Sequence, residues 1–195
     1  CESATGEIYS ISPVSGASGY DWTVPAGATI TTGDGTPSIT VDFGATAGDV
    51  TVSAINGCDT STARTLAVAI TELPAQPGAI TGNTDVCAND TGVSYSIAAV
   101  PNATNYVWTV PVGASIASGQ GTQSITVDFA STSGSVAVVP ETSGCAGPSQ
   151  STAVTVTSIP AAPGAITGNT SACSGDSDVA YSISSVAGAT SYTWS

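Results

Sequence analysis

Hydrophobic and polar residues alternate along short stretches of this chain. In residues 38–43, Ile39, Val41 and Phe43 alternate with Thr40 and Asp42. A period of two places one set of side chains on a buried face and the other in water, which is typical of a half-buried β-strand. The pattern therefore predicts strands, with Asp42 on the outer face, where we expect its carboxylate to cap the loop that follows.

Similar stretches recur along the first third of the chain, separated by Gly-, Pro- and Asn-rich turn signals. The clearest turn signals are GDGT at Gly33–Thr36 and NGC at Asn56–Cys58. Each interval between turns is long enough for one strand. The strands predicted in this part of the chain are 7–14, 19–25, 28–31, 38–43, 49–54 and 64–70.

A tyrosine and a tryptophan separated by one residue occur three times, as Tyr20–Trp22, Tyr106–Trp108 and Tyr192–Trp194. The spacing is 86 residues (108 − 22 and 194 − 108). A fixed period of this size indicates one folded unit repeated along the chain. With about seven strands per unit, the pattern predicts an all-β fold of tandem immunoglobulin-like Greek-key β-sandwiches.

Three repeats follow from this register. Residues 1–73 form a repeat that lacks its first strand, and residues 74–159 form a complete repeat, which opens with an added strand near 78–82. Residues 160–195 hold the N-terminal part of a third repeat. The joints are rich in proline, as in IPAAPGAI at 159–166, and because proline favours extended backbone we expect semi-rigid spacers.

The aromatic residues of the strands are predicted to form the core. Their alternative role is a platform on which sugar rings stack. We favour the core, because these residues share a strand face with inward Val residues and a tryptophan packs at the centre of immunoglobulin-type sandwiches. The predicted core residues are Tyr20, Trp22, Phe43, Tyr106, Trp108 and Phe129.

The five cysteines also follow the repeat. Cys1, Cys87 and Cys173 share one position, and Cys58 and Cys145 share a second. With no His and no C-x-x-C pair, a zinc site lacks ligands. We therefore expect disulfides within each repeat, Cys1–Cys58 and Cys87–Cys145, with Cys173 unpaired. Such bonds persist in oxidising compartments, which places the chain outside the cytoplasm.

Composition narrows the range of partners. The chain has 1 basic residue (Arg64), 14 carboxylates and a formal net charge of −13. This charge repels nucleic-acid phosphates and anionic lipid surfaces, so we expect neither nucleic-acid binding nor membrane insertion. The 41% hydrophobic content argues for folded domains rather than an acidic disordered tail.

Enzyme activity is not expected. Nucleophilic schemes based on Ser–His or Cys–His need an imidazole, and the chain has no histidine. A glycosidase needs two carboxylates facing each other across a cleft, but Asp42 and Asp128 supply one outward carboxylate per repeat. No cofactor is expected.

Calcium is the one metal for which the sequence offers candidate ligands. Asp85, Asn89 and Asp90 cluster near Cys87, and Asp176 and Asp178 lie near Cys173. Oxygen-rich loops can hold Ca²⁺ with six to eight ligands. No D-x-D-x-D run is present, however, and the first repeat lacks the cluster. Solvated turn residues are therefore the favoured interpretation.

The motifs Y-S-I, Y-x-W-T-V-P-x-G-A-x-I and G-x-G-T-x-S-I-T-V-D-F, with flanking cysteines, resemble the PKD-like repeats of giant Bacteroidota surface proteins. The resemblance covers the whole chain. It implies an immunoglobulin-like fold, export through the type IX secretion system, and a stalk role in adhesins or gliding-associated surface proteins. It supplies no catalytic residues.

The sequence supports three hypotheses of function. The first is a structural stalk of a long extracellular adhesin or fibre on a bacterial cell surface, whose partners are neighbouring repeats of the same chain. In that case a tip outside residues 1–195 would contact glycans or other cells. The second hypothesis is a polysaccharide-binding module. The third is a self-assembling filament subunit that exchanges strands with its neighbours.

Overall fold

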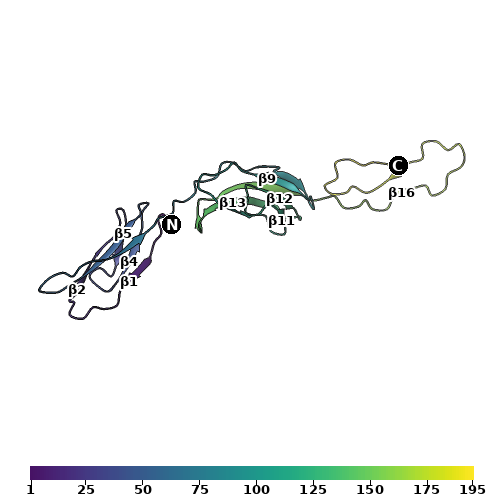
Figure 1. Ribbon diagram of the computed structural model, residues 1–195. Coiled ribbons are helices and arrows are strands. Elements are labelled where there is room, and N and C mark those ends of the chain that lie inside the picture. Colours follow the sequence, from purple (N-terminus) through teal and green to yellow (C-terminus); the bar gives the residue numbers. More distant parts are fainter. The chain divides into compact units, whose positions relative to one another are not determined.

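The computed structural model describes all 195 residues and consists of strands, turns and loops without a helix (Figure 1). The chain therefore has no helix that could span a membrane. It divides into two compact units, each interrupted in sequence. The first unit comprises Cys1–Gly78, Ala98–Val107 and Val138–Gln150, and the second comprises Ala79–Ile97, Trp108–Ala137 and Ser151–Ser195.

The first repeat is a β-sandwich of two three-stranded sheets. One sheet has the order β1-β4-β3 and the other has the order β2-β5-β6, with every neighbouring pair antiparallel. Three of the six strands thus lie in each layer. Their bounds are β1 Glu7–Ser10, β2 Gly19–Thr23, β3 Thr29–Thr32, β4 Ser38–Asp42, β5 Gly48–Ile55 and β6 Arg64–Val68.

The inward positions of both sheets meet in one hydrophobic cluster. Ile39 and Val41 of β4 are almost fully buried, and they pack with Tyr20 and Trp22 of β2. Tyr9 contacts Phe43 edge to face, with ring centroids 5.9 Å apart. The period-two alternation read from the sequence therefore corresponds to the two faces of each sheet.

The second repeat has the same strand order with additions. Its sheets are β11-β12-β9-β7 and β10-β13-β15-β8, and the short β14 pairs with β13. Besides β14, two strands have no counterpart among β1–β6: β7 pairs with β9, and β8 runs parallel to β15. The bounds are β7 Thr81–Gly82, β8 Asp85–Cys87, β9 Val93–Ser96, β10 Asn105–Thr109, β11 Ser115–Ser118, β12 Ser124–Asp128, β13 Gly134–Thr142, β14 Cys145–Ala146 and β15 Gln150–Thr157.

Residues 160–195 contain one small two-stranded sheet, β16 (Thr167–Gly168) with β17 (Tyr181–Ser182). No second sheet covers it. Tyr192 and Trp194 are accordingly 41% and 55% exposed, whereas their counterparts Tyr106 and Trp108 are buried. Burial of the Tyr-x-Trp pair thus requires the later strands of a repeat.

The G-x-G-T turn and the tryptophan form one structural element. In the first repeat Trp22 Nε1 donates a hydrogen bond to the carbonyl oxygen of Thr36 at 2.8 Å, and Trp108 makes the same bond to Thr122 at 2.8 Å. Gly33 has φ +81°, and a Cβ there would lie 2.0 Å from the Ser38 carbonyl oxygen. The turn therefore requires glycine, and it satisfies the one polar atom of a buried indole.

The leading strand β7 also depends on glycine. A Cβ on Gly82 would lie 2.2 Å from the Tyr95 ring, so β7 passes directly over that aromatic face. Tyr95 is fully buried, and its hydroxyl donates to the Asn83 carbonyl oxygen at 2.6 Å. Gly168 lies over Tyr181 in the same way. This contact explains why the sequence PGAITGN precedes each of these two tyrosines.

The first repeat has no such leading strand, and its edges are more open. Leu66, which alternates with polar residues in the sequence as an inward residue would, is 56% exposed. It lines a 220 Å³ cavity together with Tyr9 of β1 and Val52 of β5. Leu66 pairs with the buried Val50 of β5, so its side chain lies on the inner face of β6, as the alternation predicts, but it is not covered there.

Candidate functional site

The candidate site is the joint between the first and second repeats, where a buried proline, hydrogen bonds and a disulfide connect the two repeats. The residues of the joint all lie within the first compact unit. The linker that follows β6 contacts two parts of the second repeat, the loop 98–104 and the hairpin 138–149. Pro74 is fully buried there, and its carbonyl oxygen comes so close to Gly147 that a Cβ on Gly147 would lie 2.3 Å from it.

Polar contacts hold the linker on both sides of Pro74. Asn102 Nδ2 donates to the Glu72 carboxylate at 3.2 Å, and Gln76 Nε2 donates to the Ser149 carbonyl oxygen at 2.9 Å. Proline-rich sequence predicts stiffness in the linker itself. The contacts add a tertiary source of stiffness, because residues on either side of the buried proline are hydrogen-bonded to the second repeat.

A disulfide crosses this joint. Cys1 of the first repeat is bonded to Cys145 of the second, with Cα atoms 5.6 Å apart and a sequence separation of 144 residues. Cys58, Cys87 and Cys173 are free and exposed. The predicted pairs Cys1–Cys58 and Cys87–Cys145 are therefore wrong, and Cys173 is unpaired within residues 1–195, as expected.

The strand order explains why Cys1 and Cys58 do not meet. Glu2 N donates to the Thr71 carbonyl oxygen, so Cys1 lies beyond the end of β6, where Val68 pairs with Gly48. Cys58 follows the opposite end of β5, after Ile55. Eight strand residues at about 3.3 Å each separate these ends by about 25 Å, whereas a disulfide needs Cα atoms about 4.4–6.8 Å apart.

The proposed calcium ligands are used by local turns. Asp90 Oδ2 accepts a hydrogen bond from the Cys87 backbone N–H at 2.8 Å, and Asp176 Oδ2 accepts the equivalent bond from Cys173 at 2.7 Å. Asp85 Oδ2 accepts from the Thr84 hydroxyl at 3.3 Å, and Asn89 is a left-handed turn residue with φ +67°. No group of three or more His, Cys, Asp or Glu side chains is arranged to hold a metal.

The recurring carboxylates also have structural partners. Asp42 Oδ1 accepts from the Gly6 N–H at 2.8 Å, and Asp128 Oδ1 accepts from the Gly92 N–H at 2.8 Å. We expected these residues to cap the loop that follows each strand. The structure shows instead that each holds a segment 36 residues earlier in the chain.

The aromatic pairs are not available as a sugar platform in the first two repeats. Trp22 is 8% exposed and Trp108 is 2% exposed, and each indole N–H is already hydrogen-bonded. The remaining predicted core residues, Tyr20, Phe43, Tyr106 and Phe129, are buried as well. The tyrosine of each pair holds a loop: Tyr106 Oη accepts from the Val100 N–H at 3.0 Å, next to the linker.

Two tyrosines have altered acidity. Burial raises the pKa of Tyr95 above its ordinary value. Burial, followed by the nearby Glu7 carboxylate, likewise raises the pKa of Tyr9. Both effects disfavour the phenolate, because a charge is costly where water is excluded and another negative charge is close. These residues lie at equivalent strand positions and face the sandwich interior, so the shift reflects the core rather than a catalytic site.

The fold and the joint define this chain as a tandem array of β-sandwich domains. A family model described as PKD-like domain matches residues 1–68, 73–156 and 159–195. The chain belongs to the PKD-like domain family. No curated protein matches it. The predicted boundaries at 73/74 and 159/160 stay predictions, since the two compact units divide the chain differently.

Several solved structures show distant similarity. The surface layer protein SbsC (domains 1–6) is 16% identical, with 85% of this chain and 28% of that chain covered and a TM-score of 0.29. The Escherichia coli adhesin FdeC is 16% identical, with 86% and 59% covered and a TM-score of 0.31. A Bacteroides ovatus SGBP-B, solved with a mixed-linkage heptasaccharide, is 16% identical, with 88% and 48% covered and a TM-score of 0.26. At these TM-scores the similarities carry no argument about function.

Proposed function

We propose that this chain is a segment of structural stalk from a long extracellular protein of a bacterial surface, an adhesin or a surface fibre. The proposal rests on the contacts and the disulfide that connect the first two repeats. Pro74 is buried against the second repeat, and a disulfide joins Cys1 to Cys145 across the linker. A stalk must transmit force and keep its direction, and both requirements are met by limiting motion between successive domains.

The covalent bond has a mechanical consequence within this proposal. Cys1 lies at the start of the first repeat and Cys145 lies in the second, so tension applied beyond these two residues bypasses the Thr71–Gln76 linker. The low content of basic residues also suits an extracellular role, because Arg64 is the only site for proteases that cleave after Lys or Arg.

The resemblance to Bacteroidota repeats adds finer proposals: export through type IX secretion and a role in gliding. Immunogold labelling with antibodies against residues 1–195 tests the location. Gold particles that lie outside intact cells, at a distance from the outer surface, support a stalk. Labelling only after the cells are permeabilised contradicts it. Loss of the label in a type IX secretion mutant supports the finer proposal.

A glycan array separates the stalk from the polysaccharide-binding hypothesis. The stalk proposal expects no binding by residues 1–195 to any immobilised polysaccharide. Saturable binding to one class of polysaccharide, lost on thermal unfolding of the protein, would favour a binding module instead.

The strand-exchanging filament is the alternative to the stalk. Light scattering on the purified chain tests it: concentration-dependent polymers support the filament, and a monomer at all concentrations supports the stalk.

A further inference from the structure

The surroundings of Cys1 recur around Cys87. Glu2 N donates to the Thr71 carbonyl oxygen at 2.8 Å, and Ala88 N donates to the Thr157 carbonyl oxygen at 2.8 Å. These bonds place each cysteine beside the end of the last strand of its own repeat, where the linker to the next repeat begins. Cys1 is bonded to the next repeat in this position, whereas Cys87 is free and exposed.

The surroundings of Cys145 recur around Cys58 in the same manner. Gly147 N donates to the Pro140 carbonyl oxygen at 2.8 Å, and Ser61 N donates to the Ala54 carbonyl oxygen at 2.9 Å, closing equivalent hairpins. Cys58 lines a 340 Å³ cavity together with Val14 and Asn56. Their counterparts Val100 and Thr142 belong to the side of the second repeat that receives the Thr71–Gln76 linker.

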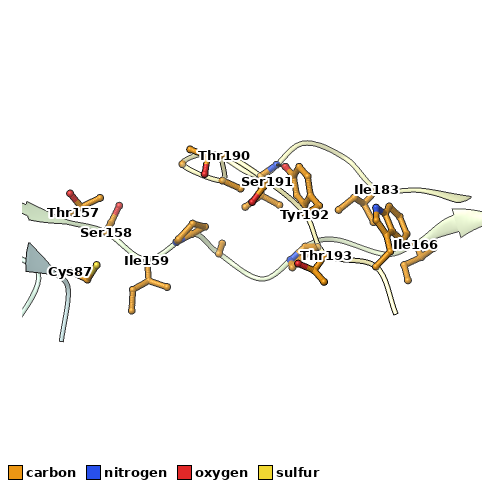
Figure 2. A pocket seen from close by; sticks show the side chains of 17 residues that line it. Cys87, Thr157, Ser158, Ile159, Ile166, Ile183, Thr190, Ser191, Tyr192 and Thr193 are labelled. Atoms are coloured by element: carbon orange, nitrogen blue, oxygen red, sulfur yellow. Dashed lines mark hydrogen bonds between the residues drawn. The ribbon is translucent and has the colours of Figure 1, made fainter. Parts of the chain in front are cut away.

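Residues 160–195 contain one part of the equivalent surface, the loop that corresponds to residues 98–104 of the second repeat. Tyr192 Oη accepts from the Val186 N–H at 2.7 Å, and Ala189 N donates to the Val186 carbonyl oxygen, as Ala103 N does to Val100. A 640 Å³ cavity lies between this loop and the end of β15, with Cys87, Thr157 and Ile159 on one side and Tyr192 on the other (Figure 2). The hairpin that would carry a counterpart of Cys145 is not among residues 160–195.

From these equivalences we propose that Cys87 forms a disulfide with the next PKD-like repeat, at the hairpin position of Cys145. The same rule makes Cys58 the acceptor of a bond from a preceding repeat. Each repeat is then bonded to both neighbours, and no disulfide lies within a repeat. This inference deepens the stalk proposal, because it extends a single bonded joint to every joint.

The bond forms by thiol–disulfide exchange with a low-molecular-weight disulfide such as oxidised glutathione. The two thiols lose two protons and two electrons as the sulfur–sulfur bond forms, and the glutathione disulfide is reduced to two thiols. Cys87 is accessible to this exchange, since it is exposed at the edge of the cavity.

The chain contains the sequence needed for a test. Ser195 is the counterpart of Thr109, so appending residues 110–159 after Ser195 completes a third repeat and adds a second copy of Cys145. The protein is refolded in a glutathione buffer, its free thiols are alkylated, and disulfide-linked peptides are identified by mass spectrometry. The proposal expects a peptide that links Cys87 to the added cysteine.

Two matched variants separate this bond from pairing within the third repeat. With Cys173→Ser, the proposal expects Cys58 to be the only residue that is alkylated. With Cys87→Ser, it expects alkylation of Cys58, Cys173 and the added cysteine. A bond between Cys173 and the added cysteine, or an added cysteine that is alkylated in the unsubstituted chain, overturns the proposal.

A second extended chain is used in case the chain extended with residues 110–159 does not fold. Residues 24–73, which carry Cys58, complete the third repeat equally well, because Thr23 is another counterpart of Ser195. Folding is read from tryptophan fluorescence, since Trp194 becomes buried only in a completed repeat. A folded extension of either kind in which Cys87 stays reduced also overturns the proposal. Either negative result leaves the stalk proposal standing, since that proposal rests on the joint between the first two repeats.

Discussion

Cys1 and Cys145 lie 144 residues apart in the sequence and are bonded across the joint between two repeats, with Cα atoms 5.6 Å apart. A bond of this kind closes a loop that contains the whole first repeat and most of the second. In the loop-entropy description, closing a loop longer than 100 residues stabilises the folded state by about 5 kcal/mol. The stabilisation acts on both repeats and the linker together, rather than on one domain.

A single trypsin cut tests this connectivity. Arg64 is the only tryptic site, and it lies between Cys58 and Cys87. After thiols are blocked and the chain is unfolded in urea, cleavage should leave residues 1–64 attached to residues 65–195 until a reductant is added. Non-reducing electrophoresis checks this. Release of the two fragments without a reductant would instead indicate disulfides within each repeat.

Trp108 should be far more important to stability than Trp194. Its indole is 2% exposed and hydrogen-bonded to Thr122, so Trp108→Ala leaves a cavity and an unpaired carbonyl group. We expect a loss of about 3–5 kcal/mol in the free energy of unfolding, measured by urea denaturation. Trp194→Ala is the matched control, because this side chain is 55% exposed, and its effect should be within about 0.5 kcal/mol.

Gly82→Ala should detach the leading strand from the second repeat. The added methyl group would lie 2.2 Å from the ring of Tyr95, which is fully buried, so the ring or the strand must shift. We expect a loss of about 1–3 kcal/mol and faster hydrogen exchange of the amides in β7 and β9. Gly78→Ala is the control, because no atom lies within 4 Å of the place that its methyl group would occupy. Equal exchange in both variants would contradict the close contact of β7 with Tyr95.

Stability should fall in alkaline solution because of the buried tyrosines. The pKa of Tyr95 is raised in the folded state, so the unfolded chain loses this proton at a lower pH than the folded chain. The unfolded state is therefore favoured progressively as the pH rises above about 10, the ordinary tyrosine value, until the folded-state pKa is passed. Thermal unfolding at a series of pH values measures the decline.

Tyr95→Phe provides the control for this pH dependence. It removes the titrating hydroxyl and the hydrogen bond to Asn83, so the variant should be less stable at neutral pH and show a shallower alkaline decline. An unchanged slope would show that another group causes the loss. Tyr9 contributes in the same direction, since its pKa is raised by burial and by Glu7.

Local patterns in the chain were sufficient to predict the class of fold, the repeat and the core. Alternation of apolar and polar residues reports directly which face of a strand is buried, and a constant spacing reports that the same unit recurs. Tyr20, Trp22 and Phe43 were therefore identifiable as core residues before any strand was placed. The PKD-like character was also readable, because it resides in local motifs such as G-x-G-T.

The three-dimensional arrangement was needed to show how the cysteines pair, what Asp42 and Asp128 hold, and how far the inner face of β6 is covered. Two cysteines at fixed positions in every repeat are equally consistent with bonds within repeats and between them, and sequence spacing does not record which end of a sandwich a turn occupies. The directions of the strands determine these positions. Because β5 and β6 are antiparallel, Cys58 and Cys1 lie at opposite ends of the first repeat, and Cys145 of the next repeat lies beside Cys1. Leu66 shows the same limit, because alternation places its side chain on the inner face of β6 but does not show how far that side chain is covered.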